Sequence, residues 1–203
     1  MIWLFDLDNT LYPYSIGLYQ HINCLMNQYL EKTLKLSWEE VDQIRTNYIK
    51  QYGTTLLGMM IHHHINPDKF LQEIHSFDVG KFLKKEPALL EFLQKLSGKK
   101  YIFTNSPQFY ARNVLKILGI DSLFEDVFSI ETVNYHGKPN MDAYQKVIEI
   151  LYTKEQIAFV DDEPANIIQA KKANMKTFLV DSRRKDFNNY YEEELFPKLK
   201  GMK

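Results

Sequence analysis

The chain has 203 residues, enough for one well-packed core and a second small lobe, because domains most often contain roughly 100–150 residues. Hydrophobic residues make up 45% of the sequence and charged residues 25%, which is typical of a globular protein and excludes a disordered chain. The formal net charge of −1 predicts no attraction to a nucleic-acid polymer or an anionic membrane. No apolar stretch reaches the roughly 18 residues of a membrane span, and no secretory signal is visible, so we expect a cytoplasmic protein.

Five short apolar runs are typical of β-strands because they are rich in aromatic and β-branched residues and are bounded by polar ones. In chain order they cover residues 2–7, 100–105, 126–130, 156–162 and 176–180. Four segments have helical spacing of apolar residues and a proline at or near the start: residues 87–96, 107–118, 139–151 and 163–173. This alternation predicts an α/β protein with a Rossmann-like parallel sheet flanked by helices.

The long interval between the first and second strands has a different pattern. Residues 15–36, 37–52 and 67–77 all show helical spacing, and none is convincing as a buried strand. We therefore expect an all-helical cap domain at residues 14–86, inserted into a core domain formed by residues 1–13 and 87–203.

Polar residues follow the predicted strands, at the edge of a parallel sheet where ligands bind. The first strand ends in Asp6 and Asp8, whose side chains lie on the same side if the extended conformation continues. Two carboxylates that close repel each other and need a cation or a shared proton. The alternative is a pair of solvated turn residues.

The second strand ends in a Thr-Asn-Ser-Pro sequence. Ser106 is expected to cap the next helix, with Pro107 at its first position. The Thr104 hydroxyl and the backbone N–H groups at that helix start would also form a receptor for an anion such as phosphate. Further on, Lys138 precedes a proline. It is either solvated or turned inward to supply positive charge.

Three consecutive acids, Asp161, Asp162 and Glu163, follow the fourth strand. One acid would be enough to cap the helix that begins near Pro164. Magnesium takes one or two carboxylates and keeps several waters, so the surplus favours a magnesium site.

The order of these pieces resembles the haloacid dehalogenase superfamily, whose phosphatases carry them in the same order: DLDNT, TN, a lysine before a proline, and DD followed by an asparagine. Together with YGTTLLG in the insert, they look like the branch that includes pyrimidine 5'-nucleotidases. Tyr110 departs from that branch, where histidine is common, and Glu163 departs where serine is usual. We expect these departures to affect the choice of substrate and not the reaction.

The resemblance implies Mg²⁺-dependent hydrolysis of phosphomonoesters through an aspartyl-phosphate on Asp6. Asp8 would be the general acid and base, and its backbone carbonyl would bind the metal. Besides Asp6 and Asp8, Asp162 is expected to bind the metal directly, and Asp161 through water.

The resemblance also assigns the phosphate site and the cap. Thr104, Asn105 and Lys138 would bind the phosphate, and Asn166 would orient Lys138 or the paired acids. In the cap, the candidate substrate contacts are Tyr52, Thr54 and Thr55, with a turn between helices, capped by Thr54, as the alternative. The histidines at 62–64 face different directions on a helix, which favours a solvated face over a metal site.

The expected substrate is a small phosphorylated metabolite, with nucleoside 5'-monophosphates first and sugar phosphates or phosphoglycolate as alternatives. A non-catalytic binding protein on the same scaffold is an alternative of another class. The intact Asp6 and Asp8 disfavour it.

Overall fold

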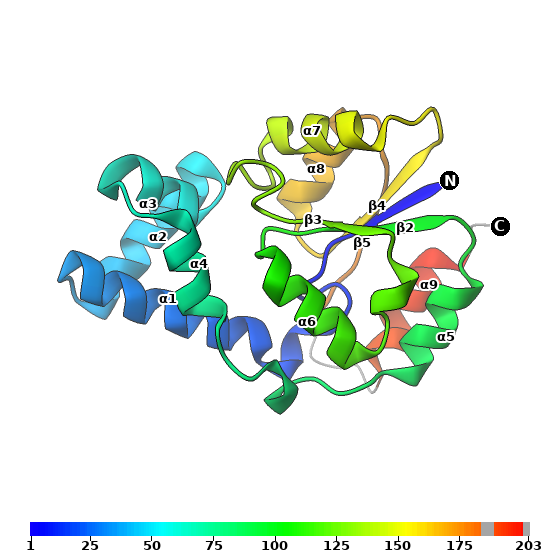
Figure 1. Cartoon of the computed structure of the whole chain (residues 1–203), viewed down its shortest axis with the longest axis horizontal. Helices are drawn as coiled ribbons and strands as arrows, with labels where there is room; N and C mark the ends of the chain where they lie inside the picture. Colours follow the sequence, from blue (N-terminus) through cyan, green and yellow to red (C-terminus); the bar gives the residue numbers. More distant parts are fainter. Residues whose placement is uncertain (184–188, 201–203) are drawn as a thin grey trace.

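The computed structural model describes residues 1–183 and 189–200 and contains one parallel sheet of five strands (Figure 1). The strand order is β3-β2-β1-β4-β5. The strands are β1 (Ile2–Phe5), β2 (Lys99–Phe103), β3 (Asp126–Phe128), β4 (Ile157–Asp161) and β5 (Lys176–Leu179). The five predicted strands and the parallel α/β class are confirmed.

The central strands β1 and β4 are buried along their whole length, as expected for apolar runs covered on both faces. Phe5 of β1 pairs with Ile102 of β2 on one side and with Val160 of β4 on the other. After β1 the chain adds β2 and β3 on one side of it, and then β4 and β5 on the other side. The direction in which strands are added therefore reverses between β1 and β4. Ligands bind beyond the carboxyl ends of the strands at such a reversal.

Helices cover both faces of the sheet (Figure 1). One face carries α5 (Pro87–Lys95), α6 (Gln108–Leu118) and the short C-terminal α9 (Phe196–Leu199). The other carries α7 (Met141–Leu151) and α8 (Pro164–Lys172). The π-helical turn Tyr191–Leu195 and α9 were not predicted; α9 docks through Phe196, whose ring stacks on Phe92 at 4.2 Å.

The start of α6 differs from the prediction. The helix begins at Gln108, with Pro107 in the capping position, so Ser106 is not the N-cap. The physical reason is that the Ser106 hydroxyl has another partner, because it donates to the carboxylate of Asp8.

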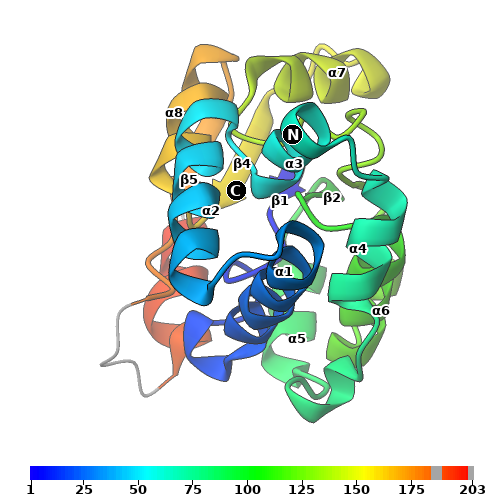
Figure 2. The same cartoon turned by 90° about the vertical axis from the view of Figure 1, so that its left-hand side faces the viewer.

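The interval between β1 and α5 is helical, as expected, and lies across the carboxyl ends of the strands (Figures 1 and 2). It contains α1 (Leu18–Leu34), α2 (Trp38–Tyr52), α3 (Thr55–His63) and α4 (Pro67–His75), with 3₁₀ turns at Tyr14–Ile16 and Val79–Lys81. We call α1–α4 the cap. In the described ranges, no helix is both long enough and apolar enough to cross a membrane.

Candidate active site

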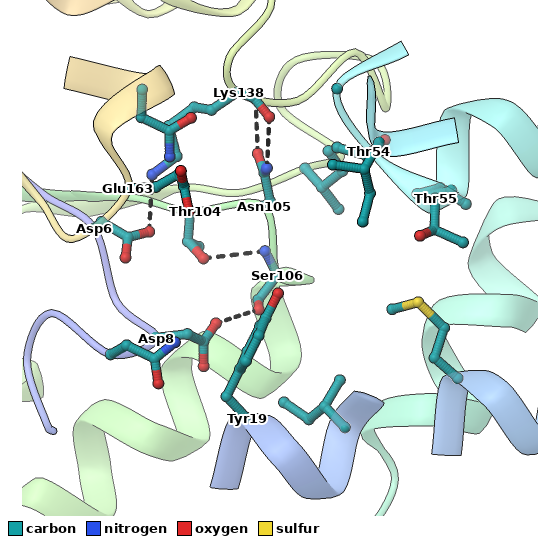
Figure 3. Close-up of a pocket in the computed structure, with 18 of the residues that line it drawn as sticks. Asp6, Asp8, Tyr19, Thr54, Thr55, Thr104, Asn105, Ser106, Lys138 and Glu163 are labelled. Carbon is teal, nitrogen blue, oxygen red and sulfur yellow. Dashed lines mark hydrogen bonds and ion pairs between the residues drawn. The ribbon is translucent and has the colours of Figure 1, made fainter. Parts of the chain in front are cut away.

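A cavity of about 360 Å³ lies between the carboxyl ends of the strands and the cap. The predicted site residues that line it are Asp6, Asp8, Thr54, Thr55, Thr104, Asn105, Lys138, Asp162 and Asn166. Figure 3 shows most of these side chains around one space. The tertiary structure therefore brings together polar residues that follow different strands.

Lys138 points inward and joins two of the acids. Its side chain is 1% exposed, and its Nζ donates to Asp6 Oδ1 and to Asp161 Oδ2, both at 2.8 Å. Burial alone would lower the pKa of Lys138, but the Asp161 and Asp6 carboxylates outweigh it and raise the pKa above its usual range. The lysine is therefore a fixed positive charge beside Asp6.

Asp161 is fully buried, and both its oxygens are occupied. Oδ1 accepts from the backbone N–H of Glu163 at 2.8 Å, and Asn166 Nδ2 lies 3.0 Å from each oxygen. With Lys138 on Oδ2, this carboxylate holds the lysine in place and has little capacity left for a direct bond to a metal. Asn166 thus contacts the carboxylate that holds Lys138 in place.

Asp6 and Asp162 keep oxygens that face the cavity. Among the described residues, none donates to Asp6 Oδ2 or Asp162 Oδ1; Lys138 holds the other oxygen of Asp6, and Ser182 holds that of Asp162. Ligand atoms of Asp6, Asp161 and Asp162 lie within 4.8 Å of one another.

The charges around these acids also fit a cation. Burial raises the pKa of Asp6 well above its ordinary value, and although Lys138 opposes this, the nearby acids add to it. Burial, followed by the charge of Asp161, raises the pKa of Asp162 to about 7. Besides Lys138, the exposed Arg183 lies 4.0 Å from Asp162 Oδ2, but these two cations do not balance Asp6, Asp8, Asp161 and Asp162. A divalent ion bound through oxygen would supply the missing positive charge.

Asp8 has entirely different partners. Its Oδ2 accepts from Ser106 Oγ at 2.5 Å, and its Oδ1 accepts from the hydroxyls of Tyr12 and, at 2.9 Å, of Tyr110. Burial and then the Asp8 charge raise the pKa of Tyr12 and of Tyr110 well above the usual range, so both phenols stay protonated and can donate.

The loop after β2 contributes two polar side chains with different roles in the site. Thr104 Oγ1 accepts from the backbone N–H of Ser106 at 3.0 Å, so its own proton can be donated into the cavity. The Asn105 side chain exchanges two 2.8 Å hydrogen bonds with the backbone of Lys138. Asn105 therefore positions the lysine segment (Figure 3).

The cap contributes the opposite wall. Thr54 and Thr55 line the cavity, and Thr54 also caps α3, because its hydroxyl accepts from the Leu57 N–H at 3.1 Å. Tyr52, which was predicted as a substrate contact, does not line the cavity. Its hydroxyl lies 2.7 Å from His62 Nε2, so it is directed at α3 instead.

Sequence reasoning missed several residues of the cavity region. They are Tyr12, Tyr19, Arg45, Ser106 and His75, and all but Tyr12 line the cavity. Tyr19 lies on α1 of the cap, and its ring points toward Ser106 (Figure 3). A tyrosine or arginine on an amphipathic helix carries no signal for a site, because the same pattern serves packing. Only the Asp-x-Asp neighbourhood of Tyr12 could have suggested a role.

The chain belongs to the haloacid dehalogenase-like hydrolase family, whose model matches residues 3–180. It is 24% identical to phosphate metabolism protein 8 of Saccharomyces cerevisiae, over 86% of this chain but only 59% of that longer protein. It is also 24% identical to the pyrophosphatase PpaX of Halalkalibacterium halodurans, over 87% of this chain and 81% of PpaX. The magnesium-bound HAD-hydrolase YfnB of Bacillus subtilis has a similar fold, with a TM-score of 0.56, 18% identity, and coverage of 92% and 89% of the two chains.

Proposed function

We propose that this protein is a Mg²⁺-dependent phosphomonoester hydrolase that works through an aspartyl-phosphate on Asp6. The main support is the arrangement of Asp6: one carboxylate oxygen is held by Lys138, and the other is left open to the cavity. The names of the two curated relatives, a phosphate metabolism protein and a pyrophosphatase, also support phosphate chemistry.

In the proposed reaction, Asp6 Oδ2 attacks phosphorus while the Thr104 hydroxyl, the Asn105 N–H and Lys138 bind the phosphate oxygens. Asp8 gives a proton to the departing oxygen and later takes one from the water that hydrolyses the aspartyl-phosphate. Asp6, Asp162 and the Asp8 carbonyl would hold Mg²⁺, with Asp161 reaching it through water. When bound, the ion neutralises charge between the nucleophile and the phosphate.

Release of phosphate from p-nitrophenyl phosphate tests this reaction. We expect turnover with Mg²⁺, none with EDTA, and none for Asp6→Asn although that variant remains folded. Exchanging the fully exposed Tyr152 for phenylalanine provides a control that leaves turnover unchanged. Undiminished turnover by Asp6→Asn would exclude Asp6 as the nucleophile.

The substrates that we propose first are nucleoside 5'-monophosphates. A cavity of about 360 Å³ is in the range of small-molecule sites, and its cap wall carries the hydroxyls of Thr54 and Thr55, which suit a sugar or base. Sugar phosphates and phosphoglycolate remain the alternatives, and a panel of phosphorylated metabolites assayed with Mg²⁺ would decide among them.

The two threonines provide a sharper test of the nucleotide proposal. Thr55→Ala and Thr54→Ala should raise KM for nucleotides more than for p-nitrophenyl phosphate, which lacks the sugar and base. Thr54→Ser keeps the helix cap and a hydroxyl, so it should behave like the wild type. Equal changes in KM for both substrates would mean that the threonines only shape the cap.

A further inference from the structure

Three hydroxyls surround the Asp8 carboxylate, one from the segment after β1 and two from the segment where α6 begins. We propose that Tyr12, Ser106 and Tyr110 are positioning residues that hold Asp8 at the leaving group of the substrate. The proposal rests on the function of Asp8 as acid and base proposed above. We call these three residues the hydroxyl cage. Its Ser106 contact is drawn in Figure 3.

The cage is neutral, and this distinguishes Asp8 from Asp6. Asp6 is paired with the cation of Lys138, which holds one of its two carboxylate oxygens. In the described part of the chain, no lysine or arginine forms an ion pair with Asp8. A hydroxyl can donate to a carboxylate or accept from a carboxylic acid, so the cage can hold Asp8 both before and after it gives up a proton.

The cage is also rigid. Tyr12 and Tyr110 are 0% and 1% exposed, and their hydroxyl oxygens lie 3.4 Å apart beside the same Asp8 oxygen. The Tyr110 ring packs against the ring of His75, the last residue of α4, with centroids 4.8 Å apart. Because these rings are packed, Asp8 cannot rotate away from the cavity without losing well-formed hydrogen bonds.

This geometry gives Tyr110 a role that differs from the one expected. Histidine is common at this position in the pyrimidine 5'-nucleotidase branch, and the tyrosine was therefore expected to affect the choice of substrate. Its hydroxyl contacts Asp8 at 2.9 Å, and Tyr110 does not line the cavity. Tyr110 is therefore a positioning residue for Asp8, the proposed proton donor, and not a residue that recognises the substrate.

Leaving-group dependence tests the cage. The leaving group p-nitrophenolate departs with little help from a proton, whereas an alkoxide needs the acid. The constant kcat/KM includes only the steps up to departure of the leaving group. Hydrolysis of the aspartyl-phosphate, which is the same for both esters, therefore does not contribute to it. For Tyr110→Phe we expect kcat/KM to fall about tenfold or more for the best alkyl ester of the metabolite panel, within the range of general acid catalysis. For p-nitrophenyl phosphate it should stay nearly unchanged.

Tyr191→Phe is the matched control, because it removes another buried tyrosine hydroxyl, one that donates to the Leu11 carbonyl at 3.2 Å. It should leave the ratio of the two kcat/KM values unchanged. Ser106→Ala should show the same selective fall in kcat/KM for the alkyl ester. Ser106→Thr, which keeps a hydroxyl, should retain the wild-type ratio of the two kcat/KM values. Tyr12→Phe and Ser106→Ala carry the test if Tyr110→Phe does not fold.

The outcomes separate the two proposals. Equal losses for alkyl and aryl esters, or no loss, across the cage variants would overturn the cage while leaving the proposed function intact. A folded wild-type protein that releases no phosphate from either ester with Mg²⁺ would overturn both.

Discussion

Lys138 Nζ lies 2.8 Å from Asp161 Oδ2, and both side chains are buried, at 1% and 0% exposure. The same nitrogen contacts Asp6 and lies 5.1 Å from the ring centroids of Phe103 and Phe159. A buried cation thus lies beside the carboxyl ends of the strands, where an unpaired charge would be costly. Its role in stability can be separated from its role in turnover.

Lys138→Met should destabilise the protein, because it leaves Asp6 and Asp161 buried without their cation. We expect the free energy of unfolding to fall by about 3–5 kcal/mol, as when one partner of a buried pair is removed. Urea unfolding in EDTA measures this loss. The double variant Lys138→Met/Asp161→Asn should recover part of it, because one of the unpaired charges is also removed. A single variant as stable as the wild type would show that the pair contributes nothing.

Magnesium should stabilise the folded protein through the acids. Binding to the native state alone adds about 2.7 kcal/mol at an ion concentration of 100 Kd, which corresponds to several degrees in Tm for a chain of this size. Asp162→Asn should remove most of the shift between EDTA and Mg²⁺. The control is Glu91→Gln, an exposed acid paired with Lys95, which should keep the full shift. An undiminished shift in Asp162→Asn would place the ion elsewhere.

Gly137 should tolerate no side chain. A Cβ there would lie 2.4 Å from Asn105 Oδ1 and 2.6 Å from Ile130 Cδ1, and Asn105 holds the backbone of Lys138. Gly137→Ala should therefore lower stability by about 1–3 kcal/mol, as overpacking does, and should lower kcat/KM by displacing the lysine. Gly80→Ala is the control, because its Cβ would approach only the exposed Asp78 Oδ1, at 3.1 Å. Similar effects in both variants would rule out this explanation.

His75 should make stability depend on pH. Its Nδ1 lies 3.0 Å from the Leu71 carbonyl, and burial lowers the pKa of the imidazole, so it stays neutral in the folded protein. The unfolded chain takes up a proton near pH 6.5, so the free energy of unfolding falls as the pH drops below about 6.5.

The variant His75→Gln lacks this proton uptake, so its stability should fall less between about pH 7 and pH 5 than that of the wild type. Denaturant unfolding at several pH values measures the difference. His136→Gln is the control, because that side chain is exposed in the folded protein. A wild-type pH dependence in His75→Gln would contradict the assignment.

The amino-acid sequence by itself determined the class of the fold and the places where chemistry gathers. Apolar runs, such as those of β1 and β4, and the helical spacing of apolar residues are local patterns. The five strands and the helices that separate them could therefore be predicted directly from the sequence. The parallel order then predicted that Asp6, Thr104 and Asp162 would lie at one edge of the sheet. The lining of the cavity agrees with this.

Only the tertiary structure decided which side chains touch. Asp8 meets Ser106 and Tyr110 from 98 and 102 residues away, and Lys138 reaches Asp6 across 132 residues. Tyr52 directly precedes the cavity residues Gly53 and Thr54 in the sequence, but its hydroxyl is directed at His62. Such pairings depend on how helices pack on the sheet and on which rotamers the core allows, and no local pattern in the sequence records either of these.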